Sequence, residues 1–417
     1  MSNLSYLEEL LGGIEVEWKA LGEIAEYSTI RVDADELDAT SFVGVDNLVA
    51  DKGGRVDAIY LPNTARVTAY RPGDVLIGNI RPYLKKIWKA TSSGGCSGDV
   101  LAVRILDKFK SVVDSEFLYY LLSSDRFFSY NMQNAKGAKM PRGDKAAILN
   151  YEIPIPCPEN PEKSLAIQAE IVRILDAFTE LTSELTSELN ARKKQYNYYR
   201  EHLFSFTEAQ AEWKTLGDVT KKWYSGGTPT AGNPEYYNGG EIPWLRTQEV
   251  KFSDIEQTQV KITLSALKNS SAKWIPANCV IIAISGATAG RSAINKIPLT
   301  TNQHCGCLKI DSTKALYRYV YHWVSFNYEN IKALGQGARG DLNSSIIKSF
   351  KFPLPYANDP EKSLAEQARI AAILDKFDTL THSISEGLPR EIALRNQQYE
   401  YYRDLLLSFP KTEEVAT

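Results

Sequence analysis

Length, composition and charge bound the class of protein. At 417 residues the chain is too long for one ordinary hydrophobic core, so two or three domains are expected. Its composition, 43% hydrophobic and 24% charged, is typical of globular proteins, and no apolar run approaches the roughly 20 residues of a membrane span. A net charge of −3 argues mildly against nucleic-acid binding. Five scattered cysteines and an N-terminus without a basic signal segment predict a reduced, cytoplasmic chain.

An internal repeat organises the sequence. Three ordered blocks of the first half return in the second half, and the match is too long to arise by chance. The blocks are EWKALGE at 17–23 with EWKTLGD at 212–218, the segment 153–178 with 352–377, and QYNYYREHLFSF at 195–206 with QYEYYRDLLLSF at 398–409. The residues between the blocks, 24–150 and 219–350, hardly match. The sequence therefore predicts a duplicated frame that presents two different recognition surfaces.

A long helix is predicted in the first copy of the frame. Asn160 or Ser164 can cap it, and Pro161 suits its first turn. Apolar residues then recur every three or four positions from Ile171 to Phe206. A helix of about 40 residues is roughly 60 Å long, so it needs a partner of equal length.

The second copy supplies that partner. Its apolar stripe runs from Ile370 to Phe409, although Gly387 and Pro389 should kink or break it. We expect the two helices to form an antiparallel intramolecular coiled coil. The predicted fold class is α+β, with two globular recognition domains joined by the two helices and an internal pseudo-two-fold duplication.

A short repeat lies within the first helix. The quartet TSEL occurs at 182–185 and again at 186–189, so Thr182, Leu185, Thr186 and Leu189 hold equivalent places. Each quartet adds roughly 6 Å of helix, and the repeat can act as a ruler that changes length by one unit. An ordinary amphipathic helix with three leucines is the alternative.

Acidic residues are absent from three segments, 75–98, 126–143 and 257–310, while basic residues remain. A positive surface on a near-neutral protein favours a polyanionic ligand such as DNA. In the first half we select the basic residues of these segments as candidate DNA contacts. They are Arg81, Lys85, Lys86, Lys136, Lys139 and Arg142.

The second half carries glycine-containing loops rich in Arg, Asn, Gln, Ser and Thr. Such side chains read base edges and bind phosphates, and glycine lets the backbone approach closely. The candidates are Tyr224, Thr228, Arg246, Ser285, Thr288, Arg291, Asn302, Gln303 and Arg339. Any one loop is explained as well by ordinary turn chemistry, but the set favours nucleic acid. We expect Arg, Asn and Gln to reach bases and Lys to contact phosphates.

No catalytic constellation is evident. The sequence has neither a Walker-type phosphate loop nor a glycine fingerprint for a dinucleotide or S-adenosylmethionine. The segments Glu17–Lys19 and Glu212–Lys214 fit half of a nuclease motif, but no aspartate pairs with them. The segment His304–Cys307 lacks zinc spacing, and the four histidines form no cluster. We therefore expect no catalytic residue and no metal site in this chain.

The two frame segments resemble those of a known family. The segment PENPEKSLAIQAEIVRILDAFTELTSELTSELNARKKQYNYYREHL at 158–203, its partner NDPEKSLAEQARIAAILDKF at 358–377 and the opening EWKTLGDV at 212–219 are similar to specificity subunits of type I restriction–modification systems, closest to the type IC branch. The resemblance covers essentially the whole chain. It implies that each variable domain reads one half of a split, asymmetric sequence in double-stranded DNA, and that the quartets set the spacer.

The resemblance also implies partners and cofactors. Two methyltransferase subunits would dock on the helices, and two restriction–translocase subunits would attach through them. S-adenosylmethionine, ATP and Mg²⁺ are expected on those partners and none in this chain. The predicted domains are 1–157 and 207–356 for recognition, with helices at 158–206 and 357–410. Two alternatives stay open: a self-contained DNA methyltransferase or nuclease, and a coiled-coil adaptor that binds only proteins.

Overall fold

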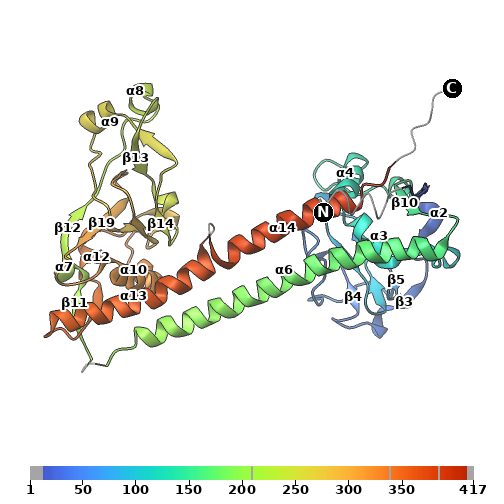
Figure 1. Ribbon diagram of the computed structural model, residues 1–417, viewed down its shortest axis with the longest axis horizontal. Coiled ribbons are helices and arrows are strands. Elements are labelled where there is room, and N and C mark those ends of the chain that lie inside the picture. Colours follow the sequence, from blue (N-terminus) through green and yellow to red (C-terminus); the bar gives the residue numbers. More distant parts are fainter. Residues whose placement is uncertain (1–12, 208–209, 338–339, 384–385, 411–417) are drawn as a thin grey trace. The chain divides into compact units, whose positions relative to one another are not determined.

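The computed structural model describes residues 13–207, 210–337, 340–383 and 386–410 (Figure 1). The chain divides into two compact units, unit 1 (1–183 with 394–417) and unit 2 (184–393). Each unit contains the sheets of one copy and segments of long helix from both copies. None of the described helices is long and apolar enough to cross a membrane.

Unit 1 is built from three small sheets. A β-pair holds β1 (Val16–Ala20) against β10 (Glu152–Pro156), antiparallel. The first four-stranded sheet has the order β2 (Ala25–Tyr27), β9 (Val100–Ile105), β6 (Val75–Gly78), β7 (Ile87–Lys89). The second has the order β3 (Arg31–Asp33), β5 (Arg66–Tyr70), β8 (Gly94–Cys96), β4 (Phe42–Val43). The helices are α2 (Leu21–Ile24), α3 (Ser115–Leu122), α4 (Asp125–Gln133) and α5 (Lys145–Leu149).

Unit 2 repeats this plan. The β-pair is β11 (Ala211–Thr215) with β20 (Lys351–Pro355). A five-stranded sheet has the order β12 (Thr220–Tyr224), β19 (Cys305–Ile310), β16 (Val280–Ala283), β17 (Ser292–Asn295), β14 (Asp254–Ile255). A three-stranded sheet has the order β15 (Val260–Ile262), β13 (Ile242–Leu245), β18 (Thr300–Thr301). The short helices are α7 (Leu216–Val219), α8 (Pro234–Tyr237), α9 (Leu264–Asn269), α10 (Tyr317–Phe326), α11 (Tyr328–Ala333) and α12 (Ser344–Ser349).

The two inserts share one topology although their sequences hardly match. The strand order β2-β9-β6-β7 in unit 1 corresponds to β12-β19-β16-β17 in unit 2, with the same antiparallel pairings. The helices α3, α4 and α5 likewise have α10, α11 and α12 at the same places in the order. The duplication therefore includes the scaffold of the recognition domains as well as the frame that the sequence identified. The predicted two-domain α+β fold is confirmed.

A buried glutamine explains why the segment around PEKS occurs in both copies of the frame. Gln168 donates to the backbone oxygen of Val112 at 2.7 Å and accepts from the backbone N–H of Asp114 at 2.9 Å. Gln367 repeats both bonds in unit 2, donating to Lys314 O at 3.4 Å and accepting from Leu316 N at 2.9 Å. Each also bonds the serine four residues earlier in the word PEKS. An unpaired buried amide is costly, so this geometry fixes the helix on its own domain.

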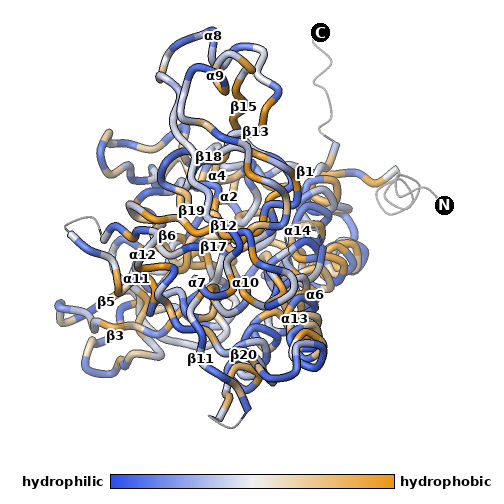
Figure 2. Tube along the Cα trace, turned by 90° about the vertical axis from the view of Figure 1, so that its left-hand side faces the viewer, coloured by the Kyte–Doolittle hydropathy of each residue, from blue (hydrophilic) through white to orange (hydrophobic). Residues whose placement is uncertain are grey.

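The first long helix is continuous and the second is in two parts. Helix α6 (Pro161–Leu203) has 43 residues. Its counterpart consists of α13 (Pro360–His382) and α14 (Gly387–Leu406), so the break predicted near Gly387 is confirmed. Gly387 begins α14 with a left-handed φ of 74°, which glycine adopts without strain. The coils of the long helices carry both hydrophobic and hydrophilic residues, as expected for amphipathic helices (Figure 2).

Helices of the two copies pair within each unit. In unit 1, Phe178 of α6 stacks on Tyr402 of α14, with ring centroids 5.4 Å apart. In unit 2, Tyr196 and Tyr199 of α6 stack on Phe377 of α13, at 5.9 and 5.2 Å. In both pairs the two helices run in opposite directions (Figure 1). The predicted antiparallel pairing therefore holds within each unit.

The spacer quartets lie where the two units join. Helix α6 runs through both TSEL quartets without interruption, and the boundary between the units falls between Ser183 and Glu184. Leu185 and Leu189 are half-buried, whereas Thr186 is exposed. The division into units cuts both long helices, so the predicted domain boundaries at 157/158 and 356/357 remain predictions.

Candidate nucleic-acid interface

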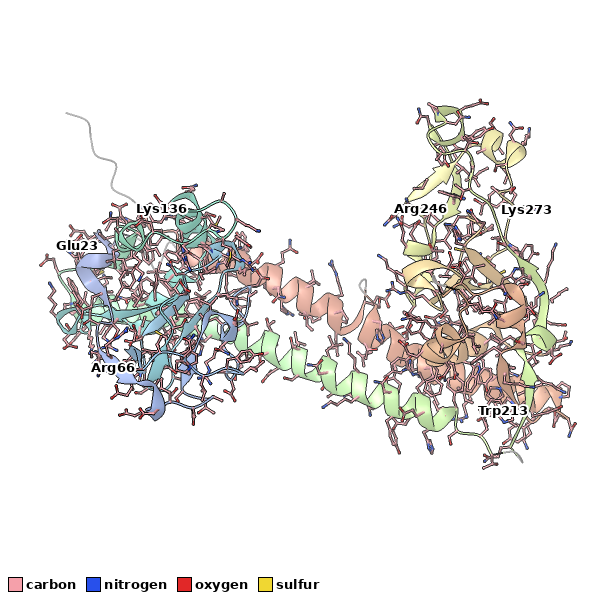
Figure 3. All side chains as sticks on the ribbon, turned by 180° about the vertical axis from the view of Figure 1, so that it is seen from behind. Glu23, Arg66, Lys136, Trp213, Arg246 and Lys273 are labelled. Atoms are coloured by element: carbon pink, nitrogen blue, oxygen red, sulfur yellow. The ribbon has the colours of Figure 1, made fainter. Side chains whose placement is uncertain are left out.

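Two basic segments of unit 1 meet at one place. The β6–β7 connection contains the 3-10 turn η3 (Pro82–Leu84), and a second loop joins α4 to α5. The backbone N–H of Gly143 donates to Asn79 O at 3.0 Å, and that of Arg81 donates to Pro141 O at 2.7 Å. Lys136, seen on the second loop in Figure 3, pairs with Arg142 across that loop. Two of the acid-free segments, remote in sequence, therefore form one surface.

The backbone of the first loop is held in an uncommon conformation. Arg81 and Lys85 flank η3 with left-handed φ values of 52° and 49°. Non-glycine residues in this region cost of order 1 kcal/mol each and persist only where the surroundings enforce them. The enforcing contacts come from a neighbouring turn, where Asp51 N donates to Leu84 O and Lys52 N donates to Lys85 O. These contacts therefore fix the backbone of the loop from which the Arg81 side chain extends.

The structure divides the six basic candidates of unit 1 into two groups. Four of them bind within the chain: Lys85 to Asp125 at 2.7 Å, Lys86 to Val45 O at 2.7 Å, Lys136 to Asp144 at 2.5 Å and Arg142 to Asp99 at 3.3 Å. The side chains of Arg81 and Lys139 are exposed and make no ion pair with any described residue. These two are the cations best placed to meet a phosphate or a base.

Asp125 ties the basic loop to the C-terminal helix. Its carboxylate lies 3.0 Å from Lys52 and 3.2 Å from Arg403 of α14, in addition to the contact with Lys85. Arg403 is 1% exposed. Burial alone would raise the pKa of Asp125, but hydrogen bonds with Lys85 and Lys52 and the charge of Arg403 hold this pKa well below its usual value. The Asp125 carboxylate therefore contacts three cations, of which Arg403 also binds Asp404 at 2.8 Å.

The polar loops of unit 2 also converge. Thr228 Oγ1 donates to Gln303 Oε1 at 2.6 Å, and Gln303 Nε2 lies 3.2 Å from His304 Nε2. His304 Nδ1 lies 2.7 Å from Ser285 Oγ. The backbone N–H of His304 donates to Asn302 Oδ1 at 3.1 Å. Four of the predicted residues of unit 2 thus belong to one network.

The remaining candidates of unit 2 lie around this network or apart from it. Arg246 follows β13 (Figure 3) and donates to Gln259 Oε1 at 3.0 Å. Tyr224 ends β12 and packs partly on the core. Thr288 and Arg291 belong to the tight β16–β17 turn, where Arg291 N donates to Thr288 O at 3.0 Å. Arg339 lies outside the described residues.

The two units place their loops at equivalent positions. In unit 2 the backbone N–H of Leu342 donates to Ile284 O at 2.8 Å, just as Gly143 bonds Asn79 in unit 1. Gln336 pairs with Asp341 as Lys136 pairs with Arg142. The loop framework is therefore common to both units. In unit 1 the basic candidates lie on it, whereas in unit 2 Ser285 and Thr288 lie on it and Thr228, Asn302 and Gln303 lie on the loops after β12 and β18.

Sequence reasoning did not select His304 as a site residue. It was considered as a zinc ligand beside Cys305 and Cys307 and set aside, but its contacts are with Ser285 and Gln303. Both cysteines are buried in β19, and burial raises the pKa of Cys305 to about 12. The polar segment TNQH at 301–304 was the feature of the sequence that could have identified His304. Within the described residues no group of three or more His, Cys, Asp or Glu could hold a metal ion.

A second polar cluster serves packing. His322 Nε2 lies 2.6 Å from Asp375 Oδ1 of α13, and Arg318 bonds the same carboxylate. His322 is 1% exposed, so the cluster joins α10 to α13 inside unit 2. The segments on β1 and β11 that fit half of a nuclease motif form surface ion pairs, Lys19 with Glu17 and Lys214 with Glu212.

Comparison with known proteins decides the family. Residues 97–194 and 210–394 match the type I restriction modification DNA specificity domain. The chain is 42% identical, over 436 residues and 100% of both chains, to the specificity subunit of the type I restriction enzyme EcoR124I/EcoR124II from Escherichia coli. The chain belongs to the type I restriction–modification DNA specificity family. The resemblance noted in the sequence is thereby confirmed, while the type IC branch stays a prediction.

Solved structures agree in fold. One, from a study of complex assembly and conformational transition of the type I restriction–modification system, is 18% identical with a TM-score of 0.61 and covers 95% of this chain and 98% of that one. The S subunit from M. genitalium is 15% identical with a TM-score of 0.59 and covers 96% and 98%. As a family member this chain is a non-catalytic DNA specificity subunit, and neither a self-contained enzyme nor a protein-only adaptor is favoured.

Proposed function

We propose that the two units read the two halves of a split, asymmetric sequence in double-stranded DNA. The observation that carries the proposal is the shared loop framework with different side chains. Both units join the loop after the third strand of the sheet order to a second loop by the same backbone bond, Gly143 to Asn79 and Leu342 to Ile284. Equal scaffolds with unequal contact groups are what two different half-sites require.

The candidate contacts are those of the two loop clusters. In unit 1 we assign Arg81 and Lys139 to direct contact, with Lys85, Lys86, Lys136 and Arg142 shaping the same positive surface. In unit 2 we assign Gln303 to direct contact, with Thr228, Arg246, Ser285 and Asn302 around it and Tyr224, Thr288, Arg291 and Arg339 as further candidates. A near-neutral chain supports only modest affinity by itself, because phosphate neutralisation supplies most non-specific binding.

Partners complete the proposed complex. Family membership supports two methyltransferase subunits docked on the long helices and two restriction–translocase subunits attached through them, all in the cytoplasm. S-adenosylmethionine, ATP and Mg²⁺ would act on those partners. Helix α6 and its TSEL quartets would set the number of unread base pairs between the half-sites.

Footprinting of the assembled complex tests the proposal. The chain is assembled with its own methyltransferase partners and the protected bases are mapped on DNA that carries the methylated motif. We expect two protected patches with sequence preference, separated by a spacer in which any base is tolerated. A single continuous patch, or protection without sequence preference, would refute the bipartite reading. Binding to partners without any protection of DNA would favour the protein-only adaptor.

A further inference from the structure

Gln303 is held from two sides on the surface of unit 2. Thr228 Oγ1 lies 2.6 Å from its Oε1 and His304 Nε2 lies 3.2 Å from its Nε2. His304 is itself held by Ser285 Oγ, 2.7 Å from Nδ1. An exposed glutamine normally samples many rotamers and loses that freedom on binding. Here the amide is oriented before any ligand arrives.

The backbone under Gln303 is fixed as well. Asn302, 9% exposed, donates its N–H to Leu245 O at 3.1 Å and accepts from the N–H of His304 at 3.1 Å. Ser225 Oγ donates to the backbone oxygen of Gln303 at 3.4 Å. The loops that follow β12, β16 and β18, together with the end of β13, therefore all contribute to one rigid position, on which Gln303 is exposed.

The Gln303 amide has hydrogen-bonding groups that its neighbours do not use. A primary amide has two N–H donors and an oxygen with two acceptor lone pairs. Thr228 occupies one group and His304 occupies the other. Whichever way the amide is turned, one N–H and one lone pair remain free on adjacent atoms. The amide of this exposed residue thus keeps one donor and one acceptor for a ligand.

We propose that Gln303 reads an adenine in the half-site contacted by unit 2. This inference rests on the proposed function and deepens it. Among the four bases, adenine alone presents a donor, the N6 amine, beside an acceptor, N7, in the major groove, and an amide side chain pairs with both. Thr228 and His304 are positioning residues that orient the amide, because each uses one of its hydrogen-bonding groups and leaves one N–H and one lone pair unused.

The test uses the complex assembled with its methyltransferase partners. The wild-type motif is first obtained by sequencing methylated host DNA, and a plasmid library then carries every single-base change of both half-sites. Methylation of each site gives a discrimination ratio for each base pair. Gln303→Ala should lower discrimination about 5- to 150-fold at one A·T pair. All positions of the other half-site should be unchanged, which shows that the complex is folded and assembled.

Three further variants separate reading from positioning and from charge. Thr228→Val removes the orienting hydroxyl and should lower discrimination at the same pair, whereas Thr228→Ser should retain it. Gln303→Glu offers acceptors only and should shift preference at that position toward cytosine. Gln257→Glu introduces the same charge at an exposed residue of unit 2 outside the network and should leave the preference unchanged.

The outcomes are distinguishable. Unchanged discrimination at every A·T pair in Gln303→Ala, or a loss confined to a G·C pair, would overturn the inference while the bipartite motif stands. If Gln303→Ala abolishes methylation, binding to the same set of DNA sites replaces it as the measurement, and an equal loss on all sites would also overturn the inference. A wild-type complex without a bipartite motif would refute the proposed function itself.

Discussion

A third TSEL quartet inserted after Leu189 should lengthen the DNA spacer by one or two base pairs. Helix α6 is continuous through both quartets, and the units join inside the first of them. Four residues add about 6 Å along the helix and about 40° of net rotation about it. One base pair of DNA advances about 3.4 Å and turns about 34°. One added pair therefore matches the rotation most closely, and two match the length.

Methylome sequencing measures this effect directly, because the spacer is the number of unread positions between the two half-sites. Deletion of 186–189 should shorten the spacer by the same amount. Insertion of four alanines should act like insertion of TSEL, because the separation of the half-sites depends on the length of α6 and not on these side chains. An unchanged spacer with active methylation, or a change of three or more base pairs, would refute the proposal that the length of α6 sets the spacer.

Three other predictions concern packing, charge and contact. Gln168→Met should destabilise the protein by about 2–4 kcal/mol in thermal unfolding, because two buried backbone groups lose their partner, whereas Gln397→Met on the exposed face of α14 should be neutral. Asp125→Asn should cost about 1–3 kcal/mol on this partly exposed site, because Lys52 and Lys85 lose their carboxylate partner while Arg403 keeps only Asp404. Arg81→Ala should lower the salt dependence of DNA binding, log K against log salt, by about 1, whereas Lys86→Ala should not.

The outcomes that contradict these predictions are specific. The pKa of Asp125 is lowered in the folded state, so its stabilisation is present above the unfolded value near 3.9 and is lost as the pH falls below it. The stability gap between wild type and Asp125→Asn should therefore narrow below about pH 4, and a constant gap would refute the charge argument. Equal salt slopes for Arg81→Ala and Lys86→Ala would refute the division of the basic residues.

Local patterns predicted the helices well. The apolar stripe from Ile171 to Phe206 and the Gly387–Pro389 break depend on neighbours three or four positions apart, so the sequence displays them directly. The common topology of the inserts was not foreseen. The pairing of β12 with β19, for example, joins Tyr224 to Cys307, and no local signal reports such distant partners.

The candidate site was predicted by segment more reliably than by residue. The acid-free segments did identify loops that meet, because charge composition is visible in sequence. Which lysines are available was not visible, since the partner of Lys86 is a backbone oxygen at Val45 and that of Lys85 is Asp125. His304 was overlooked because its role depends on its contact with Ser285. That residue is nineteen positions away in the sequence and is brought near by the β16–β19 pairing.

The order of synthesis matters for a chain divided in this way. Unit 2 is one continuous stretch, 184–393, and its core is complete once that stretch has emerged. Unit 1 needs residues from both ends: Phe409 packs on Phe117, and Trp18 donates to Pro410 O at 3.1 Å. At 5–20 residues per second, its apolar surface waits about 10–40 s for the C-terminal helix. The N-terminal domain, made first, is therefore finished last, and nascent chains truncated before α14 should expose it to aggregation.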